Sequence, residues 1–367
     1  MARKLSGDKV LFAALVALSL FGCVMIYSAS AVSSAETGGN PYRYLVKQIV
    51  ALAIGGLAAF VVYRTDYRLL ARPSIVYAAY FGAFLLCTAT LFAPPINAAR
   101  RWLRLGVLML QPSELLKIGL VLVLAHQLAK KSRATEGPER ALVPCGVLTA
   151  LAAVVVMLEP DLGTAACFVA IAFCMLWLAG ARLRWFAFAI LGLVPLAAVL
   201  ALSVGYRRAR VLSFLRPDVD PLGSGFQAIQ SLIAVGAGGW TGAGLGASRQ
   251  KLFFLPYPHT DFIFAIVGEE LGFLGAVCVV AAFAVVAWRG LRAARRAPEP
   301  AAAHLAAGAT AMLIVQAAMN LGVVLALLPT KGIALPFVSY GGSSLVACWI
   351  AGGLLLNISQ HEVPSSL

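Results

Sequence analysis

Long apolar segments alternate with short polar connections along the whole chain. A helix that crosses a bilayer core of about 30 Å needs about 20 apolar residues, and ten segments suit such helices. They span residues 10–31, 46–63, 74–92, 113–129, 141–158, 162–180, 185–204, 262–288, 302–327 and 343–357. The pattern predicts an all-α polytopic membrane protein with about ten transmembrane helices, in one domain over residues 1–367.

Composition agrees with this class and excludes a soluble domain. Of the 367 residues 61% are hydrophobic and only 12% are charged, with a mean hydropathy of +0.89. So few charges cannot form the polar surface of a soluble protein. The seven cysteines lie in apolar segments without C-x-x-C spacing, which favours packing roles over disulfides or metal ligation.

Arginine and lysine collect at alternate ends of the segments, which predicts the orientation in the membrane. Short cytoplasmic loops are enriched in these residues, and an even number of spans places both termini inside. The long connection 205–261 is then extracytoplasmic. A cleavable signal peptide ending near Ala29–Ala31 is disfavoured, since the first apolar run is longer than usual and its loss would spoil the even count. The basic residues that this orientation places on the cytoplasmic side are Arg3, Lys4, Lys9, Arg64, Arg68, Arg72, Lys130, Lys131, Arg133, Arg140, Arg182, Arg184, Arg289, Arg292, Arg295 and Arg296.

The predicted outer face is also basic, which contradicts the usual bias. The net charge is +14, and topology explains only the cytoplasmic part of it. An anionic ligand such as a lipid-linked phosphate would account for the rest, and attraction to anionic lipid headgroups is the alternative. Nucleic acid is not an expected partner. The outer basic residues are Arg43, Lys47, Arg100, Arg101, Arg104, Arg207, Arg208, Arg210, Arg216, Arg249, Lys251 and Lys331.

Polar breaks interrupt the apolar pattern in four segments of the predicted outer face, at residues 93–112, 159–164, 205–261 and 328–344. Non-helical backbone at membrane depth persists only where protein or a wet cavity satisfies its polar groups. The four breaks are therefore expected to converge on one cavity.

Charged residues also lie inside or at the edge of the apolar segments. Glu114 and Lys117 are three residues apart, so they can neutralise each other on one helix face. A packing salt bridge between helices is at least as good an interpretation of this pair as a catalytic role. Asp261 lies where a polar loop enters an apolar segment, with Glu269 and Glu270 beyond it. Such carboxylates indicate a functional site by default.

The glycines of residues 236–246 permit close backbone approach or mobility. They are weak evidence for phosphate binding, because neither a P-loop nor a dinucleotide fingerprint accompanies them. No organic cofactor is therefore expected.

Several motifs together resemble the SEDS (shape, elongation, division, sporulation) family, and its FtsW branch more than its RodA branch. The resemblance covers nearly the whole chain, and the Pro-Thr-Lys-Gly motif favours the division-type branch. It rests on residues 100–103, 111–114, 160–164, 207–210, 248–251, 259–265, 268–272, 329–332 and 339–344.

This resemblance implies a peptidoglycan glycosyltransferase of the bacterial cytoplasmic membrane, acting in division or elongation. Such an enzyme polymerises lipid II at the outer face and releases undecaprenyl pyrophosphate. Its expected partners are a class B penicillin-binding protein, membrane lipids and other divisome or elongasome proteins.

A single inverting displacement needs one base rather than two closely spaced carboxylates. Asp261 matches the essential aspartate of the family, so it is the predicted base; a helix-capping role is the alternative. A divalent cation, Mg²⁺ or Mn²⁺, could bridge Asp261 and the pyrophosphate, although no ligand cluster demands it. The predicted substrate-binding residues are Lys331, Arg101, Arg207, Arg208, Arg210, Trp102 and Ser343, and the predicted supporting residues are Glu114, Lys117, Asp161, His259 and Glu270.

Two other functions remain open at this point. A lipid II flippase would also use intramembrane charges and broken helices, but it needs a polar route through both leaflets, whereas the charges concentrate near the outer side. A noncatalytic activator of a transpeptidase would not need Asp261 when its partner is present.

Overall fold

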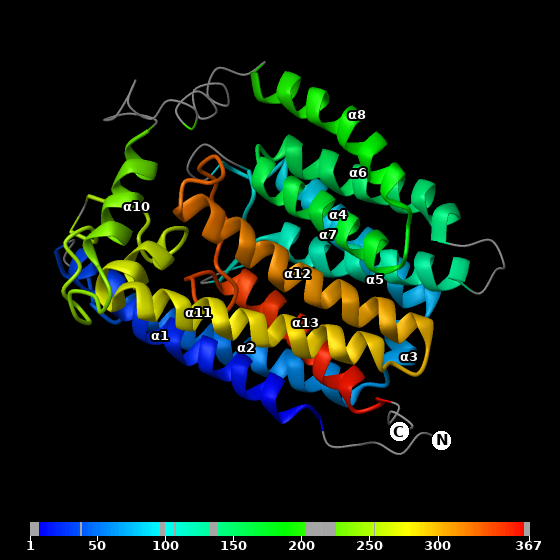
Figure 1. Cartoon of the computed structure of the whole chain (residues 1–367), viewed down its shortest axis with the longest axis horizontal. Helices are drawn as coiled ribbons and strands as arrows, with labels where there is room; N and C mark the ends of the chain where they lie inside the picture. Colours follow the sequence, from blue (N-terminus) through cyan, green and yellow to red (C-terminus); the bar gives the residue numbers. More distant parts are fainter. Residues whose placement is uncertain are drawn as a thin grey trace.

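A computed structural model of the chain describes residues 7–36, 39–95, 100–105, 108–132, 138–202, 214, 225–252 and 254–362. Helices form one elongated bundle with a small hairpin at its edge (Figure 1). Ten helices occupy the ten predicted segments. They are α1 (Lys9–Glu36), α2 (Arg43–Arg64), α4 (Pro73–Thr90), α5 (Pro112–Ser132), α6 (Leu142–Leu158), α7 (Leu162–Leu178), α8 (Leu183–Leu202), α11 (Ile263–Arg295), α12 (Pro300–Val324) and α13 (Gly342–Ser359).

Short elements lie between these helices. Strands β1 and β2 pair antiparallel, with Leu103 opposite Leu110. The short elements are α3 (Tyr67–Leu70), β1 (Leu103–Leu105), β2 (Leu108–Leu110), the 3₁₀ helix η1 (Pro138–Ala141) and α10 (Phe226–Ala237).

Eight of the described helices are long and apolar enough to cross a membrane. The 17-residue α7 and the helix α8 occupy the two remaining predicted spans. The predicted class, an all-α polytopic membrane protein, is confirmed.

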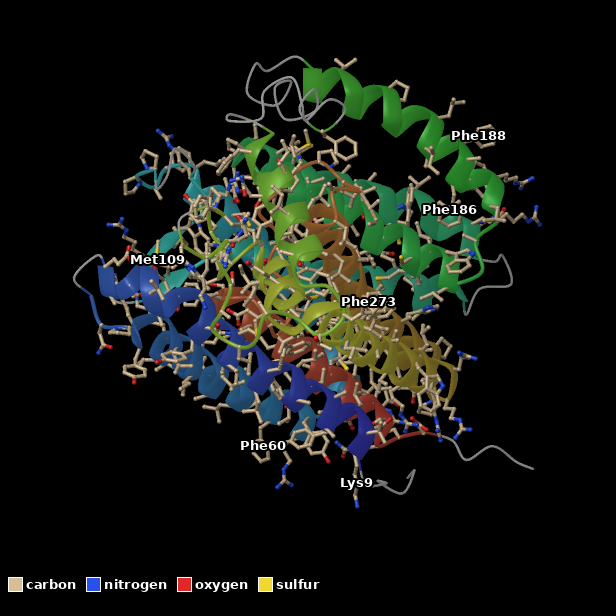
Figure 2. The ribbon with its side chains drawn as sticks, turned by 60° about the vertical axis from the view of Figure 1, so that its left-hand side comes forward. Lys9, Phe60, Met109, Phe186, Phe188 and Phe273 are labelled. Carbon is tan, nitrogen blue, oxygen red and sulfur yellow. The ribbon has the colours of Figure 1, made fainter. Side chains whose placement is uncertain are left out.

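Helices α5, α12 and α13 form the centre of the bundle, because 78% of the apolar stretch of each is buried. Outer helices instead present large apolar side chains. Figure 2 shows Phe188 on the outer side of the bundle, and Phe60, Phe188 and Phe273 are each more than half exposed. Apolar surface of this extent would be a liability in water but suits contact with lipid tails.

The start of α1 and the end of α13 lie at one end of the bundle, opposite α10 (Figure 1). Ion pairs join the segments at that end: Arg289 with Asp8, and Arg292 and Arg296 with Glu362. This arrangement agrees with an even number of crossings.

Helix α11 is broken at Gly272, whose φ of 66° and ψ of −163° are not helical. The loop after α10 repairs the interrupted hydrogen bonds. The carbonyl oxygens of Glu269 and Glu270 accept from the backbone of Ala243 and Gly244, at 2.9 and 3.0 Å. In the opposite direction, the amide of Phe273 donates to the carbonyl oxygen of Gly239 at 2.8 Å. These backbone groups of α11 therefore keep hydrogen-bond partners at the break, because lipid offers none inside a membrane.

Close approach of two backbones explains part of the glycine run. A Cβ atom at Gly242 would lie 2.2 Å from the carbonyl oxygen of Glu270, and the φ of Gly242 is +83°. No other residue fits this position without moving the loop.

We expect Gly242→Ala to destabilise the protein by at least about 1–3 kcal/mol, the usual cost of a left-handed conformation in a residue with a side chain. The backbone clash adds to that cost. Gly236→Ala is the matched control, because a Cβ there meets nothing within 4 Å and alanine favours a helix. Thermal unfolding in detergent measures the stability of both variants. Equal midpoints would contradict the requirement for glycine at position 242.

Candidate functional site

Asp261 lies directly before α11, and its carboxylate contacts the Pro-Thr-Lys-Gly loop. A Cβ atom built on Gly332 would be 3.0 Å from Asp261 Oδ2, so the carboxylate fills the space beside this glycine. Lys331 is the preceding residue; Asp261 and Lys331 are half-buried and Gly332 is exposed. The N-cap of α11 is Phe262 and makes no side-chain capping bond. The N-cap position thus falls one residue after Asp261, and the capping role of Asp261 stays a prediction.

Arg101 lies across the turn between α6 and α7. Its Nε donates to the carbonyl oxygen of Glu159 at 3.1 Å, and Nη2 donates to that of Pro160. Its Nη1 is 3.7 Å from Asp161 Oδ2. Three nitrogen atoms of Arg101 thus contact the turn, which shows a structural role; the predicted binding of the donor pyrophosphate stays a prediction. Asp161 in turn caps α7, accepting from the amide and the hydroxyl of Thr164 at 3.1 and 2.9 Å.

Glu159 is a fully buried carboxyl group in the same turn. Its Oε1 accepts from Thr90 Oγ1 at 2.9 Å, while the described residues offer no hydrogen-bond partner to its Oε2. Burial raises the pKa of Glu159 to about 7, and the nearby Asp161 adds to the rise. Glu159 was not among the residues predicted from the sequence, where its signal was a second carboxylate two residues before Asp161.

Glu114 and Lys117 form the predicted ion pair, with Lys117 Nζ 2.8 Å from Glu114 Oε2. Both side chains are buried, and Lys117 Nζ also donates to Gln316 Oε1 at 2.6 Å. The pair sits inside the bundle and links α5 to α12.

Ser343 docks the hairpin onto the start of α13. Its hydroxyl donates to the carbonyl oxygen of Met109 at 3.1 Å and accepts from the amide of Gln111 at 3.0 Å. These bonds occupy the hydroxyl, so the geometry favours docking over the predicted substrate contact. Trp102 is half-buried directly before β1.

His259 lies in an aromatic cluster beside the site. Its ring centroid is 4.4 Å from that of Tyr44 and 5.8 Å from that of Tyr340. Burial lowers the pKa of His259 to about 4, so the ring is neutral at pH 7. The backbone of Tyr340 donates to the carbonyl oxygen of His259 at 2.9 Å, which joins this loop to residues 328–344.

Glu270 belongs to a different buried cluster. Lys251 Nζ lies 2.8 Å from its Oε1, and Ser28 Oγ donates to the same carboxylate at 2.6 and 2.7 Å. Glu269 accepts from the hydroxyl of Ser248. The two carboxylates thus hold the loop 246–251 against α11 and α1, rather than contacting the Asp261 loop.

Contacts join the four polar breaks to one another, as predicted, whereas a cavity at their meeting point stays a prediction. Arg101 joins residues 93–112 to 159–164, and Ile333 lies beside Gly163, where an added Cβ would be 3.2 Å from its side chain. Asp261 and His259 join 205–261 to 328–344. The predicted residues Arg207, Arg208 and Arg210 lie outside the described part of the chain.

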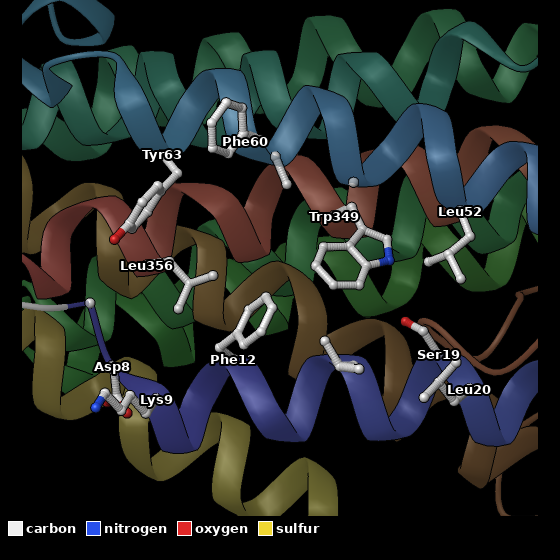
Figure 3. A pocket seen from close by; sticks show the side chains of 14 residues that line it. Asp8, Lys9, Phe12, Ser19, Leu20, Leu52, Phe60, Tyr63, Trp349 and Leu356 are labelled. Carbon is white, nitrogen blue, oxygen red and sulfur yellow. The ribbon is translucent and has the colours of Figure 1, made fainter.

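A groove of about 690 Å³ lies elsewhere, between α1, α2 and α13 (Figure 3). Phe12, Leu52, Phe60 and Trp349 contribute to its largely apolar lining, and none of the predicted site residues reaches it. The groove suits hydrocarbon rather than a sugar phosphate.

Asp261 is the candidate metal ligand that the sequence indicates at this site. In the described ranges no three histidine, cysteine or acidic side chains gather into a metal-binding group. Mg²⁺ is commonly held by one or two carboxylates together with substrate phosphates, so Asp261 alone would suffice only with oxygens from the substrate.

The fold and the site define a polytopic α-helical membrane protein with a charged site where four chain segments meet. Residues 8–363 match the family described as cell cycle protein, which comprises FtsW, RodA and SpoVE, and the chain belongs to this family. This membership confirms the SEDS resemblance predicted from the sequence.

Relatives match over nearly their whole length. The stage V sporulation protein E of Bacillus subtilis is 40% identical over 365 residues, covering 98% of this chain and 99% of that protein. A probable peptidoglycan glycosyltransferase FtsW of Geobacter metallireducens is 41% identical over 358 residues, covering 96% and 95%.

Solved structures match in the same way. A chain of a peptidoglycan synthase complex that coordinates polymerization and crosslinking superposes with a TM-score of 0.78 at 33% identity, covering 97% of this chain and 98% of that one. The rod shape determining protein RodA of Thermus thermophilus superposes with a TM-score of 0.71 at 28% identity, covering 98% and 99%.

Glu159 makes the stability of the protein depend on pH. Its pKa rises from 4.5 to about 7 on folding, so the folded state binds more protons than the unfolded state between these values. Stability from this group is present below pH 4.5 and declines as the pH rises through 7, by an amount on the order of 2–3 kcal/mol.

We expect Glu159→Gln, which cannot ionise, to be stabilised relative to the wild type at pH 8 more than at pH 5. Thermal unfolding at both values measures the difference. Glu36→Gln, at an exposed position at the end of α1, serves as the control. A Glu159→Gln difference that does not change with pH would show that this carboxyl group titrates normally.

Proposed function

We propose that this protein is a peptidoglycan glycosyltransferase that polymerises lipid II into glycan strands and releases undecaprenyl pyrophosphate. One observation carries the proposal: a single carboxylate, Asp261, lies at the junction of a polar loop and a membrane helix, against the Pro-Thr-Lys-Gly loop. The relative from Geobacter that carries this activity in its name is similar over 96% of the chain. Both termini would then be cytoplasmic and the site would face outward from the bacterial cytoplasmic membrane.

Asp261 would act as the general base. The acceptor sugar hydroxyl loses its proton to the carboxylate as its oxygen bonds to the anomeric carbon of the donor. The bond from that carbon to the pyrophosphate breaks in the same step, which inverts the centre and requires one base. Gly332 leaves the space that the carboxylate needs, and its exposure leaves the site accessible.

The leaving pyrophosphate requires fixed positive charge. Lys331 is best placed, because it precedes the glycine that contacts Asp261; Arg207, Arg208 and Arg210 remain the other candidates. Arg101 and Asp161 would shape the neighbouring turn. A bound Mg²⁺ or Mn²⁺, held by Asp261 and substrate oxygens, would neutralise charge on the pyrophosphate.

A transpeptidase partner follows from the same proposal. Glycan strands need crosslinks, and the similar synthase complex coordinates polymerization with crosslinking. We infer a class B penicillin-binding protein as the partner, within a larger divisome or elongasome.

Asp261→Asn keeps the size of the side chain but removes the base. We expect it to lower lipid II polymerisation by at least about 100-fold, the lower range of general-base contributions, with little change in thermal stability. Purified protein with its class B partner is assayed for glycan chains in the presence of moenomycin, which blocks classical glycosyltransferases.

Asp66→Asn is the control, because Asp66 caps the short helix α3, remote from Asp261 in the fold. Wild-type polymerisation by Asp261→Asn would exclude Asp261 as the base. No chains from the wild type, despite a formed complex, would instead favour the flippase or the noncatalytic activator.

Gly332→Ala would place a methyl group 3.0 Å from Asp261 Oδ2, closer than ordinary van der Waals contact. The carboxylate must shift by a few tenths of an ångström, and we expect about a tenfold loss of polymerisation rate, since small displacements of reacting groups are costly.

Gly342→Ala in the same region is the matched control, because its new Cβ would be 3.7 Å from Ala51 Cβ. Initial polymerisation rates at saturating lipid II compare the two variants. Equal rates would mean that the space beside Gly332 does not matter for catalysis.

A further inference from the structure

Two carboxamide side chains lie one helical turn apart inside α12. Gln316 and Asn320 are each 1% exposed, and residues four apart share a helix face. Buried amides without partners are costly in an apolar setting, so their hydrogen bonds show what these residues hold in place.

Asn320 joins the two loops that form the Asp261 site. Its Nδ2 donates to the carbonyl oxygen of Asp261 at 2.8 Å and to that of Ile333 at 2.7 Å. Two carbonyl acceptors require the NH₂ group at this position, which assigns the orientation of the amide. One side chain therefore spans the contact between Asp261 and Gly332.

Gln316 binds the segment 328–344, which contains Ile333 and Lys331. Its Nε2 donates to the carbonyl oxygen of Ala334 at 2.9 Å and to Ser344 Oγ at 3.1 Å. Its Oε1 accepts from Lys117 Nζ at 2.6 Å. The two amides of α12 thus connect the buried Glu114–Lys117 pair to the loop that carries Lys331.

The side-chain oxygen of Asn320 indicates that this residue is not present for packing alone. Its Oδ1 is buried and has no hydrogen-bond partner among the described residues. Such an atom is costly in a folded protein, and an apolar side chain of similar size would avoid it.

We propose that Asn320 is a positioning residue for the reaction proposed above, fixing Asp261 relative to Lys331, with Gln316 anchoring the Lys331 loop to the membrane-embedded ion pair. Asn320 donates to the backbone carbonyl oxygen of Asp261, so it sets where the base lies rather than how acidic it is. A misplacement of about 1 Å costs about 100-fold in rate.

The test compares Asn320→Leu with Asn357→Leu. Asn357 is a matched control: it is equally buried and donates to the carbonyl oxygens of Val62 and Tyr63 at 2.8 and 3.0 Å, at the opposite end of the bundle. We expect both variants to lose similar thermal stability. Only Asn320→Leu should lower kcat for lipid II polymerisation, by about 100-fold, with KM changed less than about threefold and the pH profile unshifted.

Hydrogen–deuterium exchange separates this inference from the proposed function. Asn320→Leu should speed exchange in residues 259–264 and 331–336, whereas Gln316→Met should do so only in 331–336 and Asn357→Leu in neither. These changes in exchange are measurable even if the wild-type protein makes no glycan. A wild type that makes no glycan would overturn the proposed function but not the positioning role of Asn320. Equal kcat for Asn320→Leu and Asn357→Leu, or unchanged exchange at 259–264, would overturn the positioning role.

Discussion

Backbone that leaves the helical pattern inside a membrane must find its hydrogen bonds within the protein, and this constraint shapes the structure. At Gly272 the loop 239–244 supplies the missing partners of α11. In the segment 328–344 the amides of Gln316 and Asn320 and the hydroxyl of Ser339 do the same. Water could satisfy such groups in a soluble protein, but lipid cannot. The irregular segments are consequently bound to one another, and the site forms where they meet.

Pairing of buried charges is the second consequence of the low-dielectric surroundings. Removing one partner leaves an uncompensated charge, so buried pairs are tightly interdependent. Lys117 lies with Glu114, Lys251 with Glu270, and Arg101 with Asp161. The basic character of the predicted outer face is therefore partly structural. For the proposed binding of an anionic donor, Lys331 stays the first candidate, because it directly precedes the glycine beside Asp261.

The chemistry proposed for Asp261 depends on how little its environment moves. Its backbone is held by Asn320, and its carboxylate lies beside a glycine. Neutral His259, on the same loop as Asp261, packs against Tyr44 and Tyr340. A base held in this way needs no rearrangement to meet an acceptor hydroxyl, which is how a preorganised site lowers a barrier.

The sequence by itself determined the membrane class, the ten apolar segments, the Glu114–Lys117 pair and the position of Asp261 at a helix start. These features are local: hydropathy acts over about 20 residues and the ion pair over three. Only the tertiary structure decided the partners of charges and amides far apart in the chain. Ser28 reaches Glu270 across 242 residues, and Asn320 reaches Asp261 across 59. The loop partners of Arg101, Ser343 and Glu270 were likewise not predictable, because the segments that carry these partners meet only in the folded bundle.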